Sequence, residues 1–128
     1  MVELRLAYPD AAQDRDRHNH RDSIVYLARP ALLSDADIIS ARPSLAGSGE
    51  LLLHLRFTPE AGLRLATTLQ DHIGGYLAVV VEGRLRNVVV IASPVGSQNE
   101  LNLNTSLTGP DAERVRELAR TKWPLPRR

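Results

Sequence analysis

Four histidines are the side chains of this sequence with the most versatile chemistry, since histidine serves both as a general base and as a metal ligand. His18 and His20 stand two residues apart in a charged segment that also holds Arg15, Arg17 and Arg21. A metal site needs further rigidly held ligands, and these arginines repel a cation. The pair therefore predicts solvated surface rather than a metal site, and the letters HNH alone do not indicate a nuclease.

His54 and His72 are the remaining candidates for acid–base chemistry. His54 alternates with the apolar residues of a predicted strand, so its side chain is expected to point outward, away from the core. His72 lies at the predicted C-terminus of a helix, where the helix dipole favours a positive charge. Both are interpreted as structural. A hydrolase using either histidine is the enzyme-class alternative, and it requires a pocket where the imidazole meets a carboxylate and a hydroxyl.

The glycine-rich segments do not have the context of a phosphate-binding loop. Gly47-Ser48-Gly49 joins two predicted strands and Gly74-Gly75 follows a predicted helix, whereas a phosphate loop precedes a helix N-terminus. Cysteine is absent, which excludes disulfides, thiolate zinc sites and cysteine nucleophiles. Asp35 and Asp37 fit the capping of a helical turn better than shared acid–base work. We therefore expect a protein without catalytic residues, metal or cofactor.

Length and composition indicate one soluble domain covering residues 1–128. The chain is 43% hydrophobic and 24% charged, which is typical of globular proteins. Its net charge of +1 gives no bulk electrostatic reason to bind nucleic acid or anionic lipid. The apolar runs are far shorter than the roughly 20 residues that cross a bilayer. Neither a nucleic-acid partner nor a membrane span is expected.

The residues leave the compartment open. The first five residues alternate charged and apolar side chains and lack the basic and apolar regions of a signal peptide. A cysteine-free protein also tolerates either redox compartment. The expectation is therefore a periplasmic or extracytoplasmic domain if a targeting segment was removed, and otherwise a cytoplasmic protein.

The N-terminal half that carries these side chains is predicted to be mostly strands. The segment 11–22 is too charged to enter a core and is interpreted as a mobile surface loop. Ser34 is expected to cap a helical turn. Alternating apolar residues predict strands over residues 2–7, 23–28, 38–45 and 50–57, and the last two form a hairpin.

Helix signals are strongest after the second hairpin strand. Thr58 can cap a helix, Pro59 suits its first position, and Gly74-Gly75 ends it. A second helix is expected from Thr108, which stands three residues before Asp111 as a variant capping box. The apolar residues expected to line the buried faces of the two helices are Ala61, Leu65, Leu69 and Ile73 in the first, and Ala112, Val115, Leu118 and Ala119 in the second.

The remaining strands complete the expected architecture. Residues 76–81 and 84–92 form a hairpin around Glu82-Gly83, and both of its strands are expected to be central in the sheet. Residues 93–97 form a loop, and residues 100–105 form an outer strand. The expected fold is α+β, with two layers: a mostly antiparallel sheet and two amphipathic helices on one face.

The order of these motifs resembles the first large periplasmic domain of the SecD and SecDF protein-export family. The likeness rests on Thr58-Pro59-Glu60-Ala61, a helix ending at His72-Ile73-Gly74-Gly75, and the segment 77–85 (LAVVVEGRL). Residues 2–6 (VELRL), residues 32–38 (LLSDADI), and the last helix with its exit at 124–126 (PLP) are similar to the family as well.

Two departures limit what the resemblance implies. The family's Ser-Ala-Pro-Val-Ile strand is NVVVI at residues 87–91, and its following glycine-rich segment is GSQNE at residues 96–100. The family's transmembrane helices have no counterpart, so the resemblance does not carry over proton-driven work. It implies a periplasmic, non-catalytic domain that contacts unfolded preprotein.

A partner of this kind is expected to use an exposed strand. The outer strand at 100–105 can accept an extended peptide by strand addition, with Leu101 and Leu103 as contacts. Trp123 is a further candidate contact, although packing of the C-terminal tail on the core explains it better. The alternatives are an envelope adaptor or a homodimer built on exposed sheet edges, because function need not follow fold.

Overall fold

The structure is a computed structural model that describes residues 1–21, 23–92 and 99–124. The predicted loop at 93–97 and most of the exit at 124–126 lie outside these residues. In the described chain the strands are β1 (Val2–Tyr8), β2 (Arg15–His20), β3 (Ser23–Ala28), β4 (Ile38–Leu45), β5 (Leu51–Phe57), β6 (Tyr76–Val81), β7 (Arg84–Val90) and β8 (Glu100–Asn104). The helices are the 3-10 turn η1 (Asp35–Asp37), α1 (Pro59–Gln70) and α2 (Gly109–Lys122).

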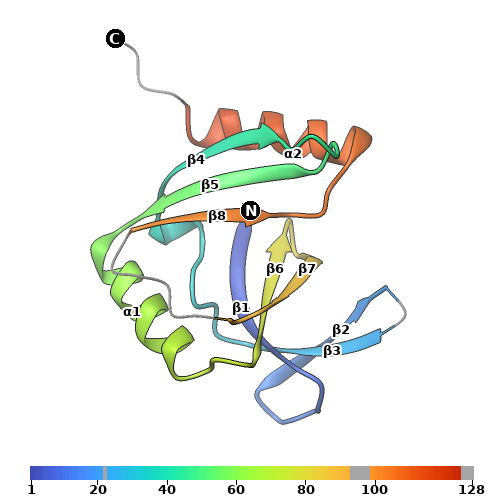
Figure 1. Cartoon of the computed structure of the whole chain (residues 1–128), viewed down its shortest axis with the longest axis vertical. Helices are drawn as coiled ribbons and strands as arrows, with labels where there is room; N and C mark the ends of the chain where they lie inside the picture. The colour runs from blue at the N-terminus through green and yellow to red at the C-terminus, as the bar shows by residue number, and fades with distance from the viewer. Residues whose placement is uncertain (22, 93–98, 125–128) are drawn as a thin grey trace.

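The strands form two antiparallel sheets, so the α+β class is confirmed while the single expected sheet is replaced by two. The order is β2-β3-β1-β6-β7 in the five-stranded sheet and β4-β5-β8 in the other. The three-stranded sheet runs across β1 and β6 (Figure 1). The hairpins β4–β5 and β6–β7 follow from local turns, whereas β1 with β6 and β5 with β8 join distant segments that no local pattern specifies.

The two sheets and both helices share the main core, while a second, smaller cluster is formed by Ala7, Leu27, Ala78 and Val80 of the five-stranded sheet. Alternate residues of β1 and β6, among them Leu4 and Val79, face alternate residues of β5, among them Leu53. The helices lie far apart in Figure 1, yet Leu65 of α1 and Val115 of α2 are both buried in this core. The main core therefore depends on both sheets and both helices, and the five-stranded sheet also buries apolar residues on its other face.

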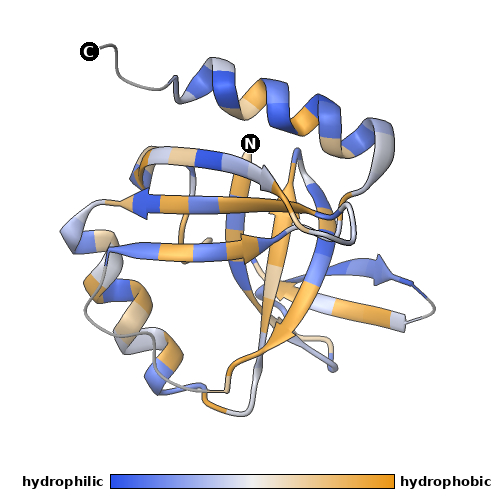
Figure 2. Ribbon diagram, turned by 45° about the horizontal axis from the view of Figure 1, so that its top comes forward, coloured by the Kyte–Doolittle hydropathy of each residue, from blue (hydrophilic) through white to orange (hydrophobic). Residues whose placement is uncertain are grey.

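The segment 11–22 is not a loop, and this prediction was wrong. Residues 15–20 form β2, which pairs with β3 along its whole length. In Figure 2, β2 is hydrophilic along its length and lies beside the apolar β3. The guanidinium of Arg15 stacks 3.5 Å from the centre of the Tyr8 ring, and Asp16 binds Arg29 at 3.0 Å. Backbone pairing does not require apolar side chains, so charge alone did not exclude a strand.

Local helix signals were largely correct. Thr58 Oγ1 accepts a hydrogen bond from Ala61 N at 3.3 Å, which confirms the predicted cap of α1. The helix ends at Gln70, so Ile73 is 51% exposed instead of buried. Thr108 is the cap residue of α2 but its side chain makes no capping hydrogen bond, so the variant capping box is absent there.

Candidate functional site

Strand β8 is an edge of the three-stranded sheet, as expected from the sequence. In antiparallel pairs, hydrogen bonding alternates along each strand. Thr105 N donates to Leu51 O at 3.1 Å, and Phe57 N donates to Asn99 O at 2.9 Å. Odd-numbered residues of β8 thus direct their backbone N–H and C=O toward β5. Glu100, Asn102 and Asn104 direct theirs outward, away from the sheet.

The opposite edge, β4, is obstructed. Ala46 N donates to Glu50 O at 2.9 Å, and the same alternation leaves the odd-numbered residues of β4 facing outward. Pro43 is one of them, and proline has no N–H to offer an added strand. Pro43 also lines a depression of 240 Å³ together with Ala41, Arg42, Arg120 and Trp123, so the end of α2 lies beside this edge.

A single side chain ties the edges of the two sheets together. Asn87 Oδ1 accepts a hydrogen bond from Val88 N at 2.9 Å, and Asn87 Nδ2 donates to Asn104 O at 3.0 Å. Val88 N faces outward on β7, because Ile91 N bonds back to Gly75 O. The amide of Asn87 therefore occupies one outward group on β7 and one on β8. Strand β7 is an edge of the five-stranded sheet, so the prediction that it is a central strand was wrong.

The remaining edge, β2, carries charge at its outward positions. Arg29 N donates to Asp14 O at 3.0 Å, so Arg15, Arg17 and Asn19 direct their backbone groups away from β3. Charged side chains on an edge discourage the addition of another strand. In the described chain, the least obstructed edge is thus the part of β8 at Glu100 and Asn102.

The structure separates the three residues expected to contact a partner. Leu103 lies opposite Leu53 and is 4% exposed, so its side chain belongs to the core. Leu101 is half-buried against the same core. Trp123 is half-buried against the core beside β4, at the other edge of the sheet. What the β8 edge presents to a partner is therefore backbone, with part of Leu101 beneath it.

His54 faces outward, as predicted, and lies beside this open edge. Its Nδ1 is 2.6 Å from Asn102 Oδ1, and its Nε2 is 3.6 Å from Glu100 Oε1. Arg42 lies opposite His54 on β4. The histidine thus meets a carboxylate on an open sheet face.

The other histidines lie in two places, one just after α1 and the other on β2. His72 Nδ1 is 2.7 Å from Thr68 O within the α1 segment. His18 is half-buried on β2, and His20 lines an apolar groove of 360 Å³ with Tyr76 and Val88 among its other walls. Within residues 1–21, 23–92 and 99–124, no three His, Cys, Asp or Glu side chains are placed to hold a metal ion.

Asp35 is a polar centre whose role the sequence reading missed. Its carboxylate accepts hydrogen bonds from the ammonium of Met1 at 2.5 Å and from Val2 N at 2.7 Å, and it binds Lys122 Nζ at 2.8 Å. Burial acts to raise the pKa of Asp35, but the hydrogen bonds from Lys122, Met1 and Val2 outweigh it and hold the pKa below its ordinary value. These partners are remote in sequence, so no local signal could have identified them.

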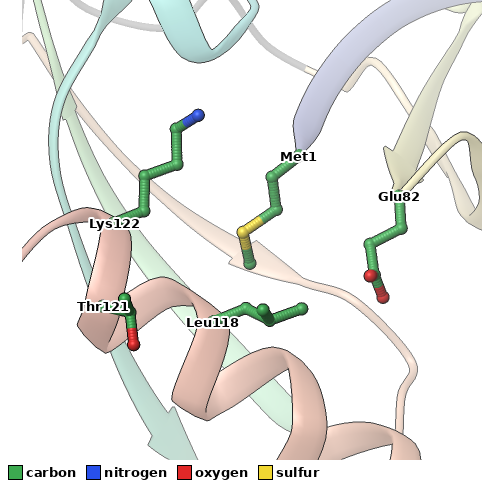
Figure 3. A pocket seen from close by; sticks show the side chains of 5 residues that line it. All are labelled: Met1, Glu82, Leu118, Thr121 and Lys122. Carbon is green, nitrogen blue, oxygen red and sulfur yellow. The ribbon is translucent and has the colours of Figure 1, made fainter.

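A depression of 470 Å³ adjoins this centre. Figure 3 shows the side chains of Met1 and Leu118 facing each other across it, with Glu82 and Lys122 at its sides. Leu118, predicted to be buried on α2, is 40% exposed here. The depression thus marks where the end of α2 is incompletely covered by β1.

Comparison with known proteins gives one consistent family. The family model described as SecDF, P1 head subdomain, matches residues 9–120. No curated protein sequence matches the chain. None of the helices in the described residues is both long and apolar enough to cross a membrane.

Solved structures show the same fold. One is of SecDF, a membrane component that enhances protein export: TM-score 0.66, 21% identity, covering 94% of this chain and 60% of that chain. Another is SecDF in its super-membrane-facing form, with TM-score 0.67, 21% identity, 94% of this chain and 18% of that one. A third is SecDF, a translocon-associated membrane protein from Thermus thermophilus, with TM-score 0.50 and 26% identity, covering 73% of this chain and 13% of that chain. The chain spans only part of each.

Proposed function

The chain belongs to the SecDF P1 head subdomain family, and from this membership we propose that it is a non-catalytic domain that binds extended polypeptide during protein export. One of the similar structures is of a component that enhances protein export. The partner in this proposal is unfolded preprotein, or an envelope protein presenting an extended segment. The same proposal puts the domain on the periplasmic side of the membrane.

The observation that carries the proposal is the outward-facing backbone of Glu100 and Asn102 in β8, to which no strand of the described residues is paired. Glu100 and Asn102 present N–H and C=O groups outward, and an extended chain can pair with them as an added strand. Backbone pairing is independent of sequence, which suits a partner that presents many different unfolded segments. The half-buried Leu101 offers limited apolar contact, so binding is expected to be weak and reversible.

The two hydrogen bonds of the Asn87 side chain, to Val88 N and to Asn104 O, form a bridge between β7 and β8. This Asn87 bridge defines where the added strand ends. Asn104 O is already bonded to Asn87 Nδ2, so a partner strand loses that acceptor. The proposed binding segment is thus short, centred on Glu100 and Asn102. A short pairing length fits a domain that must release its partner.

Titration with an unfolded preprotein peptide tests the proposal. We expect the amide signals of Glu100, Asn102 and Asn104 to shift, while those of β4 remain unchanged because Pro43 obstructs that edge. At about 1 mM peptide, even binding worth only about 4 kcal/mol gives visible shifts. Absence of any shift in β8 at that concentration would reject the proposal.

Two variants at one position isolate the backbone contribution. Asn102→Pro removes an outward N–H without deleting a hydrogen bond to β5, whereas the matched control Asn102→Ala keeps that N–H. Both lose the contact with His54. The proposal expects peptide binding to weaken in the proline variant only. Equal weakening in both variants would assign binding to the Asn102 side chain instead. Sedimentation of the domain without peptide shows whether two copies associate through the same edge, which distinguishes self-association from peptide binding.

A further inference from the structure

Three arginines converge on a polar hollow that is separate from the β8 edge. The hollow has a volume of 280 Å³, and its walls are Glu82, Arg84, Arg86 and Arg114. Glu82 begins the β6–β7 turn, Arg84 and Arg86 belong to β7, and Arg114 comes from α2. Two distant segments thus bring like charges together, which costs free energy unless an anion or carboxylate compensates them.

Strand β7 has a β-bulge at Arg86. Val80 pairs with Leu85 and Val79 pairs with Asn87, so Arg86 is the extra residue between the two pairs. A bulge of this kind breaks the alternation of a strand and re-aims a side chain. Residues two apart on a strand share a face, and Arg84 and Arg86 keep this arrangement beside the bulge, because both line the hollow.

Carboxylates neutralise only part of the cluster. Arg114 hydrogen-bonds Glu82, and its Nη2 is 3.6 Å from Asp111 Oδ1. For Arg84 and Arg86 there is no ion pair with any carboxylate in the described residues. Arg86 Nε is buried, and within that same part of the chain it has no hydrogen-bond acceptor. A buried guanidinium donor without an acceptor is unfavourable.

We propose that Arg84, Arg86 and Arg114 form an oxyanion-binding site that takes a phosphate group. A planar guanidinium fork matches the geometry of phosphate oxygens, and three such forks from two elements surround one anion. The phosphate can be free inorganic phosphate or the headgroup of an anionic phospholipid, since both present the same oxygens. This site does not depend on the proposed peptide binding.

Titration of the 128-residue chain with sodium phosphate at low ionic strength tests the site. Saturable shifts are expected for the amides of Glu82 to Asn87 and of Arg114, with sodium chloride at equal ionic strength giving none. Arg84→Gln with Arg86→Gln should weaken phosphate affinity about tenfold or more, because two charged forks are lost. Lysine at the same two positions keeps the positive charge but lacks the planar bidentate donors of arginine, so an intermediate affinity for phosphate is expected.

The matched control removes the same number of positive charges by changing two arginines elsewhere in the protein. Arg42→Gln with Arg56→Gln alters the outer face of the three-stranded sheet and should leave phosphate affinity unchanged. Equal weakening in both double variants, or no saturation by phosphate in the unmodified chain, overturns the proposal. Sedimentation with vesicles of anionic or neutral phospholipid then identifies the source of the phosphate group. Co-sedimentation of the protein with anionic vesicles that free phosphate reverses supports a lipid headgroup. Absence of co-sedimentation supports free phosphate.

Discussion

Single residues of this protein divide into those whose role follows from local sequence and those whose role requires the fold. Thr58 caps α1 through an amide three residues away, so its type and position sufficed to predict it. Asp35 was interpreted as a cap, yet it joins the start of β1 to the end of α2 through Val2 and Lys122. Leu103 looked like a partner contact because alternation cannot tell which face of an outer strand is buried.

Asp35→Asn should lower the free energy of unfolding by about 1–2 kcal/mol at pH 7, because charge-assisted hydrogen bonds to Val2 and Lys122 are weakened. The pKa of Asp35 is lower in the folded than in the unfolded state, so its contribution is present above its ordinary value of 3.8 and disappears as the pH falls through the folded value. Urea unfolding at several pH values should therefore show the two proteins converging in acid.

The control for this prediction is Asp71→Asn, at the exposed end of α1. Its effect on stability should stay within about 0.5 kcal/mol at all pH values, as for most surface changes. If the difference in free energy of unfolding between Asp35→Asn and the unmodified protein stayed the same at low pH, the stabilisation would not come from the charge of Asp35.

Among the elements, hairpins and helix ends were predictable while strand order was not. The turn at Glu82-Gly83 has φ of 53° and 76°, the left-handed conformation that a tight hairpin needs and that glycine favours. The pairing of β8 with β5 has no such local signal, and the polar β2 resembled a loop by composition. The open edge of β8 was predicted as an outer strand, but its accessible groups became known only from the register.

Asn87→Ala should expose the outward amide of Val88 and release Asn104 O. Hydrogen exchange at Val88 is expected to accelerate, and the free energy of unfolding to fall by about 1 kcal/mol. Asn87→Asp separates the two bonds, because a carboxylate can accept from Val88 N but cannot donate to Asn104 O. In that variant Val88 should stay protected; if exchange at Val88 is unchanged even in the alanine variant, the bridge does not form.

At the scale of the whole molecule, both sheets and both helices share one core, so we expect them to unfold together. Leu4→Ala in β1 removes a fully buried side chain and should cost about 2–5 kcal/mol. The control Leu63→Ala changes a side chain that is 71% exposed and should have little effect. Fluorescence of Trp123, the one tryptophan, and backbone circular dichroism should give the same unfolding midpoint. Two separate midpoints would show that the sheets are independent.

Pro43 leaves the three-stranded sheet with one edge, β8, at which another strand can pair. A strand can join at β8, whereas Pro43 obstructs the far edge at β4, so the sheet can be extended on one side only. Two copies meeting through β8 would present only their β4 edges outward, and no third copy could extend them through this sheet. Self-association through β8 would thus stop at a dimer instead of seeding a fibre.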